Sequence, residues 1–505
     1  MQITLQHGDL LDVSADVLVV NVFEGVAQPG GATGAVDKAL DGALSDLLKR
    51  DGFQGKRGER LVFPTFGKLK ARKVAVIGLG PRQGFSADTI RYVGGCIARL
   101  AREAKAKKVA TMLHGAGVAG LEASEAAQAL AEGLHLGAYR FHAYRGTGSK
   151  ELMAAHTEVG EIAIYETERS KIKPGLAGLE RGRVLAEGTM LARDLVNTPS
   201  EDMTPLHLAE IAKSLTVRGS VRCTVLDKAK MESLGMGGAL AVARGSIHPP
   251  VGIHLVYMPK KRAKKRVAVI GKAVTFDSGG LNIKHEMGMV TMKCDMAGAA
   301  AVLGLFKVLP VLNLPVEVHG IFLAVENMTS GSAYRPGDVV KTMNGMTIEI
   351  LNTDAEGRVT LADALSYVVK KVKPEAMVDL ATLTGAAIMA LGEDISALMS
   401  NDKKLTKEWL NAAKYTGEEY WELPLYPSYN EAINSKIADM NNTGGHKAGA
   451  IKAGLLLQRF VGDTPWIHLD IAGPAYVEKE SRPDISYGGT GAGVRTLAKW
   501  IEDME

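Results

Sequence analysis

The sequence contains few cysteines, and they form no recognisable framework. Its 505 residues include only Cys96, Cys223 and Cys294, which lie far apart and make no Cys-x-x-Cys pair. An odd number of cysteines at such distances excludes a disulfide scaffold. We therefore expect free thiols in a chain that works in a reducing compartment.

The sequence also lacks the segments that carry a chain into or across a membrane. Its first nine residues, MQITLQHGD, have no basic stretch followed by an apolar one, so we expect no secretory signal. No uninterrupted apolar run reaches the ~18 residues that a membrane-spanning helix needs. These absences favour a cytoplasmic protein with no membrane partner.

A large excess of one charge is missing as well. The 60 basic and 56 acidic residues give a formal net charge of +4, which is too small to imply a polyanionic partner. One basic run, KKRAKKR, stands out at residues 260–266, between two expected strands. It could bind DNA as a secondary role, but a solvated loop is the simpler interpretation.

What is present is a regular alternation of strands and helices. In the first third, the patterns predict strands at residues 15–23, 73–78, 108–114 and 161–165, and helices at residues 35–49, 86–105 and 124–137. This alternation indicates a mainly parallel sheet covered by helices. A glycine cluster, GGATG at residues 30–34, could contact a nucleotide-like ligand, but a plain loop is the simpler interpretation.

The second part of the chain repeats the pattern with stronger strands, expected at residues 252–258, 266–271, 316–325, 377–383 and 466–471. The sequence predicts one β-hairpin, because Asn344-Gly345 joins two further strand candidates and both residues tolerate a positive φ. A long helix near residues 178–196 is expected to connect two domains. We therefore expect an α/β protein with domains at residues 1–170 and 199–505, joined by a connecting helix at 171–198.

Two segments put charged residues directly beside strands of the buried type, where charge is costly unless it is paired or bound to a metal. In the first, an apolar strand runs into Lys272, and Asp277 follows with two glycines that allow a tight turn before Lys284. In the second, Asp295 is a lone carboxylate that opens a helix of small residues.

A third segment, NTDAEGRVTLAD, carries Asp354, Glu356 and Arg358 at every second position. In an extended chain these three side chains would lie on one face. Two carboxylates so close repel each other unless a cation lies between them, and carboxylate oxygens suit a hard divalent cation. The segment therefore predicts a metal site.

The residues that follow are expected to start a helix. Thr360 and Asp363 fit a Thr-x-x-Asp capping box for a helix at residues 361–371. The metal-facing residues would then lie where a strand turns into a helix, which is where open α/β sheets bind ligands.

Taken singly, each segment also fits a structural role as an edge strand, a surface lysine or a helix cap, but the joint pattern is specific. GK-x4-DSGG-x3-K, the Asp295 segment and NTDAEGRVTLADAL resemble the leucyl aminopeptidase family, which includes cytosol aminopeptidase and bacterial aminopeptidase A. Further matches are NTPSEDMTP, ATLTG, SKIAD, GLLL and HLDIAGP, and the resemblance is strong over residues 191–497. It implies a smaller macro-like N-terminal domain and a larger metallopeptidase domain.

The resemblance also implies a set of metal ligands. Lys272, Asp277, Asp295 and Glu356 would hold one divalent ion, and Asp277, Asp354 and Glu356 would hold another. A lysine must be neutral to donate a lone pair, and two divalent cations nearby would lower its pKa. His285 and Cys294 neighbour these positions and could add ligands, although ordered neighbours are the simpler interpretation.

By the same resemblance, Lys284 is the electrophile that stabilises the oxyanion, and Arg358 holds a bicarbonate ion that acts as general base. A guanidinium fork suits that planar anion. The pocket for the first residue of the substrate is expected to be lined by Met292, Thr382, Leu383 and Gly385.

The implied protein is a two-metal aminopeptidase. It would remove an N-terminal leucine or another apolar residue from peptides by means of a hydroxide that bridges two Zn²⁺ or Mn²⁺ ions. The family is usually hexameric, so a homohexamer is expected. No catalytic position is altered, which argues against an inactive relative.

Overall fold

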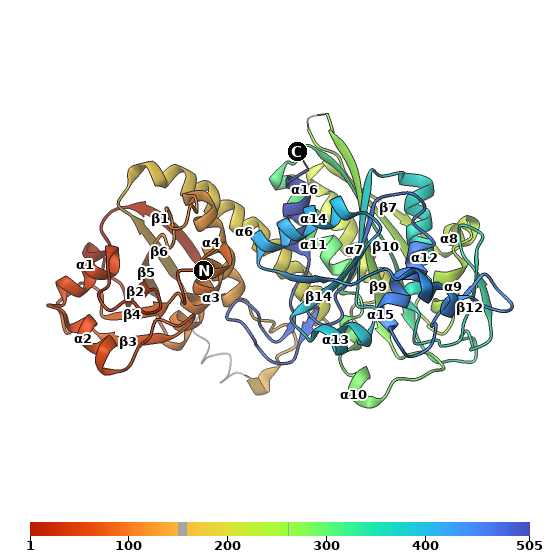
Figure 1. Cartoon of the computed structure of the whole chain (residues 1–505), viewed down its shortest axis with the longest axis horizontal. Coiled ribbons are helices and arrows are strands. Elements are labelled where there is room, and N and C mark those ends of the chain that lie inside the picture. Colours follow the sequence, from red (N-terminus) through yellow and green to blue (C-terminus); the bar gives the residue numbers. More distant parts are fainter. Residues whose placement is uncertain (150–158, 261, 505) are drawn as a thin grey trace. The chain divides into compact units, whose positions relative to one another are not determined.

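The computed structural model describes residues 1–149, 159–260 and 262–504, and the chain divides into two compact units (Figure 1). Unit 1 comprises Met1–Ala186 and Lys479–Ser486, and unit 2 comprises Glu187–Glu478 and Tyr487–Glu505. The long helix α6 (Arg169–Asn197) contributes residues to both units. The expected α/β class is confirmed, with a smaller N-terminal and a larger C-terminal sheet. The finer domain boundaries at residues 170 and 198 stay predictions.

Unit 1 is a six-stranded sheet with helices on both faces. The strands follow the order β1-β6-β5-β2-β4-β3, and neighbours are parallel except for β3 and β4. Its elements, with η1 and η2 as short 3-10 helices, are β1 (Gln2–His7), η1 (Leu10–Asp12), β2 (Val17–Val22), α1 (Gly31–Ala39), α2 (Ala43–Arg50), β3 (Arg60–Pro64), β4 (Lys73–Gly78), α3 (Ala87–Glu103), β5 (Lys108–Met112), α4 (Ala123–Ala138), η2 (Thr147–Ser149) and β6 (Glu161–Glu166).

The central strand β2 shows why its sequence is apolar throughout. Val17 and Val19 pack in one core cluster with α3 and α4, whereas Leu18, Val20 and Val22 pack in another with α1 and α2. A strand covered on both faces has no side that must be polar, so VLVVNV is almost continuously apolar.

Two details of unit 1 differ from expectation. The helix expected at residues 35–49 is divided into α1 and α2, because the backbone at Asp41 and Gly42 turns with positive φ. The edge strands β1 and β3 were not expected, since many of their side chains are exposed and their apolar runs are short.

Unit 2 contains an eight-stranded mixed sheet in the order β15-β14-β17-β13-β9-β10-β8-β7. Parallel pairs join the four central strands, and β14 and β8 flank them in antiparallel pairs. The remaining elements, with η5 as a π-helix, are α7 (Pro205–Ser214), η3 (Leu215–Arg218), β7 (Val221–Leu226), α8 (Lys228–Leu234), α9 (Gly237–Ala243), β8 (Val251–Tyr257), β9 (Lys265–Asp277), α10 (Glu286–Met289), η4 (Met292–Cys294), α11 (Ala297–Leu312), β10 (Val316–Asn327), β11 (Val339–Lys341), β12 (Thr347–Glu349), α12 (Gly357–Tyr367), η5 (Val368–Val372), β13 (Ala376–Ala381), α13 (Gly385–Leu391), β14 (Ile395–Ser400), α14 (Lys403–Thr416), β15 (Glu419–Glu422), η6 (Pro427–Ile433), β16 (Met440–Asn441), α15 (Gly449–Gln458), β17 (Trp466–Asp470), β18 (Tyr476–Val477), β19 (Gly488–Gly489) and α16 (Val494–Glu502).

The strands expected in this part are found as β8, β9, β10, β13 and β17. The expected hairpin is found as well, because β11 and β12 pair antiparallel and Gly345 adopts a φ of 97° at the turn. Most of the unit's smaller elements were not expected, since they are short or lie at the sheet edges.

The two faces of β9 meet different helices. Ala268, Ile270 and Val274 belong to a core cluster that also includes residues of α9, α12 and α15. On the other face, Gly271 approaches α11 so closely that a Cβ there would lie 2.5 Å from the backbone of Gly298. Because side chains alternate along a strand, Lys272 shares the face of Ile270 and lies beneath the start of α12.

One helical stretch in the described part of the chain, Glu286–Leu312, is long and apolar enough to span a membrane by length and composition. Charged residues interrupt its apolar run, so the stretch has no uninterrupted membrane-spanning pattern in the sequence. Of its most apolar window, 78% is buried inside the protein, and α11 packs on β9, β10 and β13. This is the position of a core helix.

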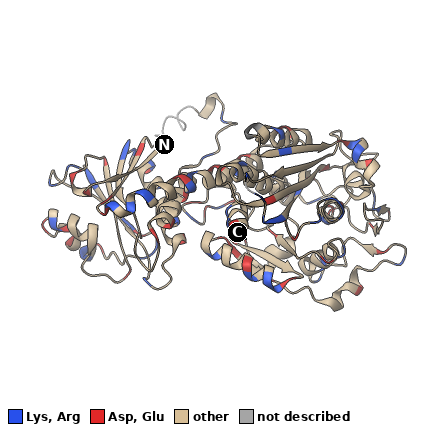
Figure 2. Ribbon diagram, turned by 90° about the horizontal axis from the view of Figure 1, so that it is seen from above, with Lys and Arg blue, Asp and Glu red and all other residues tan. Residues whose placement is uncertain are grey.

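Positive and negative side chains are interspersed over both units (Figure 2). The basic run at residues 260–266 ends in β9, where Arg266 pairs with Glu317 at 2.7 Å. Lys260, Arg262 and Lys264 are exposed, and Lys261 lies outside the described residues.

A buried histidine in unit 1 makes the stability of the fold depend on pH. His114 is fully buried, contacts Asn21 and lies 2.7 Å from the Thr111 hydroxyl, and burial lowers its pKa to about 3. The unfolded chain, with an ordinary histidine pKa of ~6.5, therefore binds a proton that the folded chain rejects. The contribution of the neutral His114 to the free energy of unfolding should be fully present above pH 6.5, and it should be lost as the pH falls towards 3.

We predict that this residue alone costs about 2 kcal/mol of unfolding free energy between pH 7 and pH 5. Urea titrations at the two pH values measure the loss. The variant His114→Gln should lose less stability over this interval, while His207→Gln, at an exposed position, should behave like the wild type. Equal losses in all three proteins would contradict the assignment.

Candidate metal centre

The first part of the centre lies where β9 ends. Its last residue, Asp277, is followed by a turn in which Gly279 and Gly280 adopt φ values of 85° and 63°, as expected for the two glycines. The Gly279 N–H donates to Asp277 Oδ1 at 2.9 Å, and the Lys284 N–H donates to the Ser278 carbonyl at 2.9 Å. The turn therefore brings the Lys284 side chain back towards Asp277.

The second part is the loop that precedes α12, and here the expected local structure is wrong. Asp354 lies in a turn and Glu356 is the N-cap of α12, so the segment is not an extended strand. The two carboxylates nevertheless converge, because the chain turns between them.

The expected capping box is also wrong. Helix α12 already begins at Gly357, so the Thr360 hydroxyl donates to the Gly357 carbonyl inside the helix. Asp363 instead accepts the backbone N–H groups of Ala239 and Met343 at 2.9 and 2.8 Å. Asp295 likewise ends η4 and is not the N-cap of α11, a position that Met296 occupies.

Buried amides and hydroxyls hold the two loops together. The Thr353 hydroxyl donates to the Gly279 carbonyl at 2.6 Å, and the Thr353 N–H donates to Asn282 Oδ1 at 2.9 Å. Asn327 Nδ2 donates both to Asp277 Oδ1 at 2.8 Å and to the Thr353 carbonyl at 3.0 Å. The loops are thus fixed by protein hydrogen bonds between amide, hydroxyl and backbone groups, to which Asp277 contributes through Oδ1.

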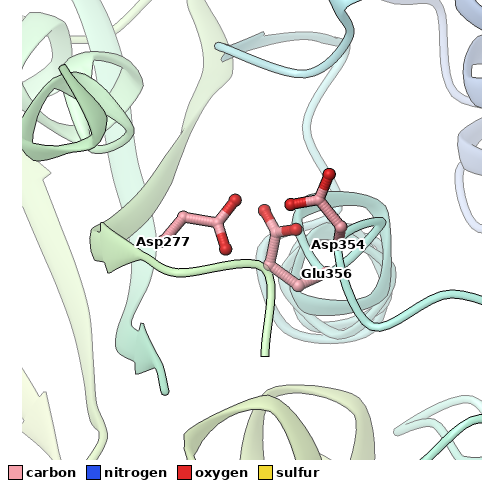
Figure 3. Close-up of side chains that lie close together, drawn as sticks. All are labelled: Asp277, Asp354 and Glu356. Atoms are coloured by element: carbon pink, nitrogen blue, oxygen red, sulfur yellow. The ribbon is translucent and has the colours of Figure 1, made fainter. Parts of the chain in front are cut away.

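Three carboxylates meet at this point. Asp277, at the end of β9, and Asp354 and Glu356, at the start of α12, point towards one another, and each offers an oxygen within 4.8 Å of the others (Figure 3). Asp277 and Glu356 are buried, and Asp354 is half-buried.

Two lysines contact the carboxylates. Lys272 Nζ lies 2.8 Å from Asp295 and 2.8 Å from Glu356, and it donates to the Thr382 carbonyl at 2.8 Å. Lys284 Nζ lies 2.9 Å from Asp277 and 2.5 Å from Asp354. The five expected metal ligands and Lys284 therefore converge from three distant segments.

Burial shifts the pKa values of the charged groups in the centre. Burial raises the pKa values of Asp277, Asp295 and Asp354 above their ordinary value, and their carboxylate neighbours raise them further, while the lysines oppose this. Burial lowers the pKa of Lys272, but contact with Asp295, Glu356 and Asp277 outweighs burial, so its net pKa is raised. In the chain by itself, the ammonium form is favoured, and added divalent cations would reverse this preference.

The donor set fits divalent ions. Asp295 Oδ2 and Glu356 Oε2 are buried and accept no hydrogen bond from any residue that the structure describes. A buried carboxylate oxygen without a partner is costly, and a hard cation would satisfy it. Cys294 also lies close by, but burial raises the pKa of its thiol to about 12, which disfavours the thiolate that a metal ligand needs.

The centre opens into a cavity of about 570 Å³. All the expected site residues line it, including Arg358 and the four predicted substrate residues Met292, Thr382, Leu383 and Gly385. His285 is not among the described residues that line the cavity. Several other lining residues have no role predicted from the sequence, namely Leu351, Asn352, Ile388, Thr443, His446 and Ala472. Asn352 and Ala472 lie in the motifs NTDAEGRVTLADAL and HLDIAGP, which could have pointed to them.

Comparison with known proteins decides the family. Residues 190–498 match the catalytic domain of the cytosol aminopeptidase family, and residues 19–147 match its N-terminal domain. The chain belongs to the cytosol aminopeptidase family. It is a metallo-exopeptidase of the leucyl aminopeptidase type, and the recognition made from its motifs is confirmed.

Relatives of this aminopeptidase match along its whole length. A probable cytosol aminopeptidase of Alkaliphilus oremlandii is 41% identical over 505 residues and covers 100% of both chains, and one of Cyanothece sp. is 42% identical over 97% of both. Among solved structures, the bottromycin maturation enzyme BotP in complex with Mn has a TM-score of 0.84 and 36% identity, covering 97% of this chain and 99% of BotP. A mutant tomato leucine aminopeptidase has a TM-score of 0.87 and 33% identity, covering 100% and 96%.

One glycine of this aminopeptidase gives a test of the centre. A Cβ at Gly357 would lie 2.7 Å from Lys272 Nζ, whereas a Cβ at Gly288 would meet nothing within 4 Å. We predict that Gly357→Ala displaces the Lys272 ammonium and lowers kcat/KM for a leucyl anilide by on the order of 10²-fold, the usual effect of a misplacement near 1 Å. Gly288→Ala is the matched control and should leave kcat/KM unchanged. Full activity in Gly357→Ala would show that the position of Lys272 is unimportant.

Proposed function

We propose that this aminopeptidase removes leucine and other apolar N-terminal residues from peptides by using two divalent ions held at the closed end of the cavity. The observation that supports this proposal is the convergence of Asp277, Asp354 and Glu356 with two lysines, in a donor set that leaves buried carboxylate oxygens unsatisfied.

The residues divide into two overlapping ligand sets. Lys272, Asp277, Asp295 and Glu356 would hold one ion, and Asp277, Asp354 and Glu356 would hold the other. Lys272 would lose its proton when the ions bind, because like charge lowers the pKa of an ammonium group. The structure of BotP, to which this chain is similar, contains Mn, and Mn²⁺ or Zn²⁺ suits these ligands.

When bound, the ions supply Lewis-acid activation of the scissile carbonyl and of the attacking water, and a binding site for the α-amine of the peptide. Lys284 adds a positive donor at the cavity, and it would donate to the carbonyl oxygen as negative charge develops there. Its contacts with Asp277 and Asp354, at 2.9 and 2.5 Å, support this role, because they hold the ammonium group beside the proposed metal ligands.

Arg358 would hold a bicarbonate ion that accepts the proton of the attacking water. Its side chain is buried, lines the cavity, and leaves Nε without an acceptor among the described residues. A guanidinium group that stays positive at neutral pH binds a planar anion through two parallel hydrogen bonds. Arginine itself is too basic to serve as the general base.

The preference for leucine rests on the wall of the cavity. Met292, Thr382, Leu383 and Gly385 line the cavity and would contact the first side chain of the substrate, with Met292 and Leu383 supplying apolar side chains. We further propose a homohexamer in the cytoplasm. The exposed lysines of residues 260–266 leave DNA binding as a secondary role, which a gel-shift assay with strong salt dependence would detect.

The ligand assignment predicts that Glu356→Gln abolishes release of leucine from a leucyl anilide, since an uncharged amide cannot replace a carboxylate shared by two cations. The circular dichroism spectrum should remain unchanged. Glu408→Gln, at a surface position of α14, is the control and should be fully active. Full activity in Glu356→Gln would refute the assignment.

Metal removal gives a second test. Dialysis against a chelator should abolish activity, and adding Mn²⁺ or Zn²⁺ should restore it as two ions bind per chain. Elemental analysis measures the stoichiometry alongside the activity. Turnover that persists when no metal is detectable, or full activity with one ion per chain, would contradict the two-ion proposal.

A further inference from the structure

One buried carboxylate beside the cavity takes no part in the metal centre. Asp470 is the last residue of β17 and is only 1% exposed. Its Oδ1 accepts the backbone N–H groups of Leu383 at 3.1 Å, Thr384 at 3.4 Å and Ala472 at 3.2 Å, and its Oδ2 accepts the Thr384 hydroxyl at 2.7 Å. One side chain therefore satisfies four donors.

These donors belong to two neighbouring loops at the cavity. Leu383, Thr384 and Ala472 all line it, Leu383 and Thr384 after the end of β13 and Ala472 after the end of β17, and these two parallel strands end next to each other. The Thr384 hydroxyl that donates to Asp470 also accepts the Ala387 N–H at 3.1 Å, so the same contact fixes the start of α13. Ile388 of α13 lines the cavity as well.

The metal half of the cavity is held by different contacts. Thr382 donates its hydroxyl to Asp295 at 2.6 Å and accepts the Lys272 ammonium group at its carbonyl. Neither contact involves Asp470. Removing the Asp470 carboxylate would thus release residues 383–385 and Ala472 while leaving the metal ligands in place.

We propose that Asp470 is a positioning residue that sets the width of the pocket for the first side chain of the substrate. This inference rests on the proposed role of residues 382–385 as the wall of that pocket. A carboxylate that binds both loops keeps this side of the pocket fixed, and a fixed apolar pocket discriminates between side chains that differ by a few methyl groups. Without it the two loops can shift, and kcat/KM then falls less for a substrate with a small first side chain than for one with a large first side chain.

The test compares leucyl and alanyl anilides with the full-length protein. In Asp470→Ala, the ratio of kcat/KM for leucine over alanine should fall roughly tenfold, a part of the ~10–200-fold discrimination that an apolar pocket provides. KM for the leucyl anilide should rise more than kcat falls, and the metal content should stay at the wild-type level. Asp470→Asn keeps an oxygen for the three N–H groups and should restore most of the ratio.

Asp363→Ala is the matched control. Asp363 is also fully buried and also accepts backbone N–H groups, but it does not line the cavity. It should lower stability without changing the ratio. If Asp470→Ala does not fold, Thr384→Val, which removes one of the four contacts, should shift the ratio in the same direction by a smaller factor.

An unchanged ratio in the folded Asp470→Ala or in Thr384→Val would overturn the proposal. So would an equal change in Asp363→Ala, or loss of metal from Asp470→Ala in step with its activity. The wild-type activity and its loss in Glu356→Gln test the proposed function separately, because neither depends on the leucine-to-alanine ratio.

Discussion

The structure depends on one electrostatic constraint, which is that four carboxylates, three buried and one half-buried, lie close together beside only two lysines. Asp277, Asp295, Asp354 and Glu356 outnumber the two lysine ammonium groups that contact them. Burial raises the pKa values of three of them, so the ionised cluster would be unfavourable without further positive charge. In the proposed function, divalent cations would supply that charge, and the fold would hold the carboxylates in place until the cations bind.

Two separate sets of hydrogen bonds hold the residues that line the cavity. Thr353, Asn282 and Asn327 hold the loops that carry the carboxylates through hydrogen bonds to amide and backbone oxygens, with Asp277 Oδ1 as one further acceptor. Asp470 holds the loops that follow β13 and β17, which also line the cavity. Charge can then vary at the centre, as ions and substrate arrive, without the walls losing their hydrogen bonds.

Much of the fold and of the metal centre could be predicted from the sequence, but one correct prediction rested on a wrong local structure. The central strands follow from apolar runs, since burial on both faces requires them, whereas exposed edge strands such as β1 gave no clear pattern. Asp354 and Glu356 were grouped because alternate residues of a strand share a face, yet they meet because the chain turns into α12. The grouping was right because the motif resembles a known family. The role of Asp470 could not be identified from local pattern, because its Leu383 and Thr384 donors lie 87 and 86 residues from it along the chain.

The most direct measurement is anomalous X-ray diffraction from crystals of the Mn²⁺-loaded protein. Two anomalous peaks should lie in the cavity, both within coordination distance of Asp277 and Glu356 and one of them bonded to Lys272 Nζ. A single peak, or peaks away from these carboxylates in an active preparation, would contradict the account.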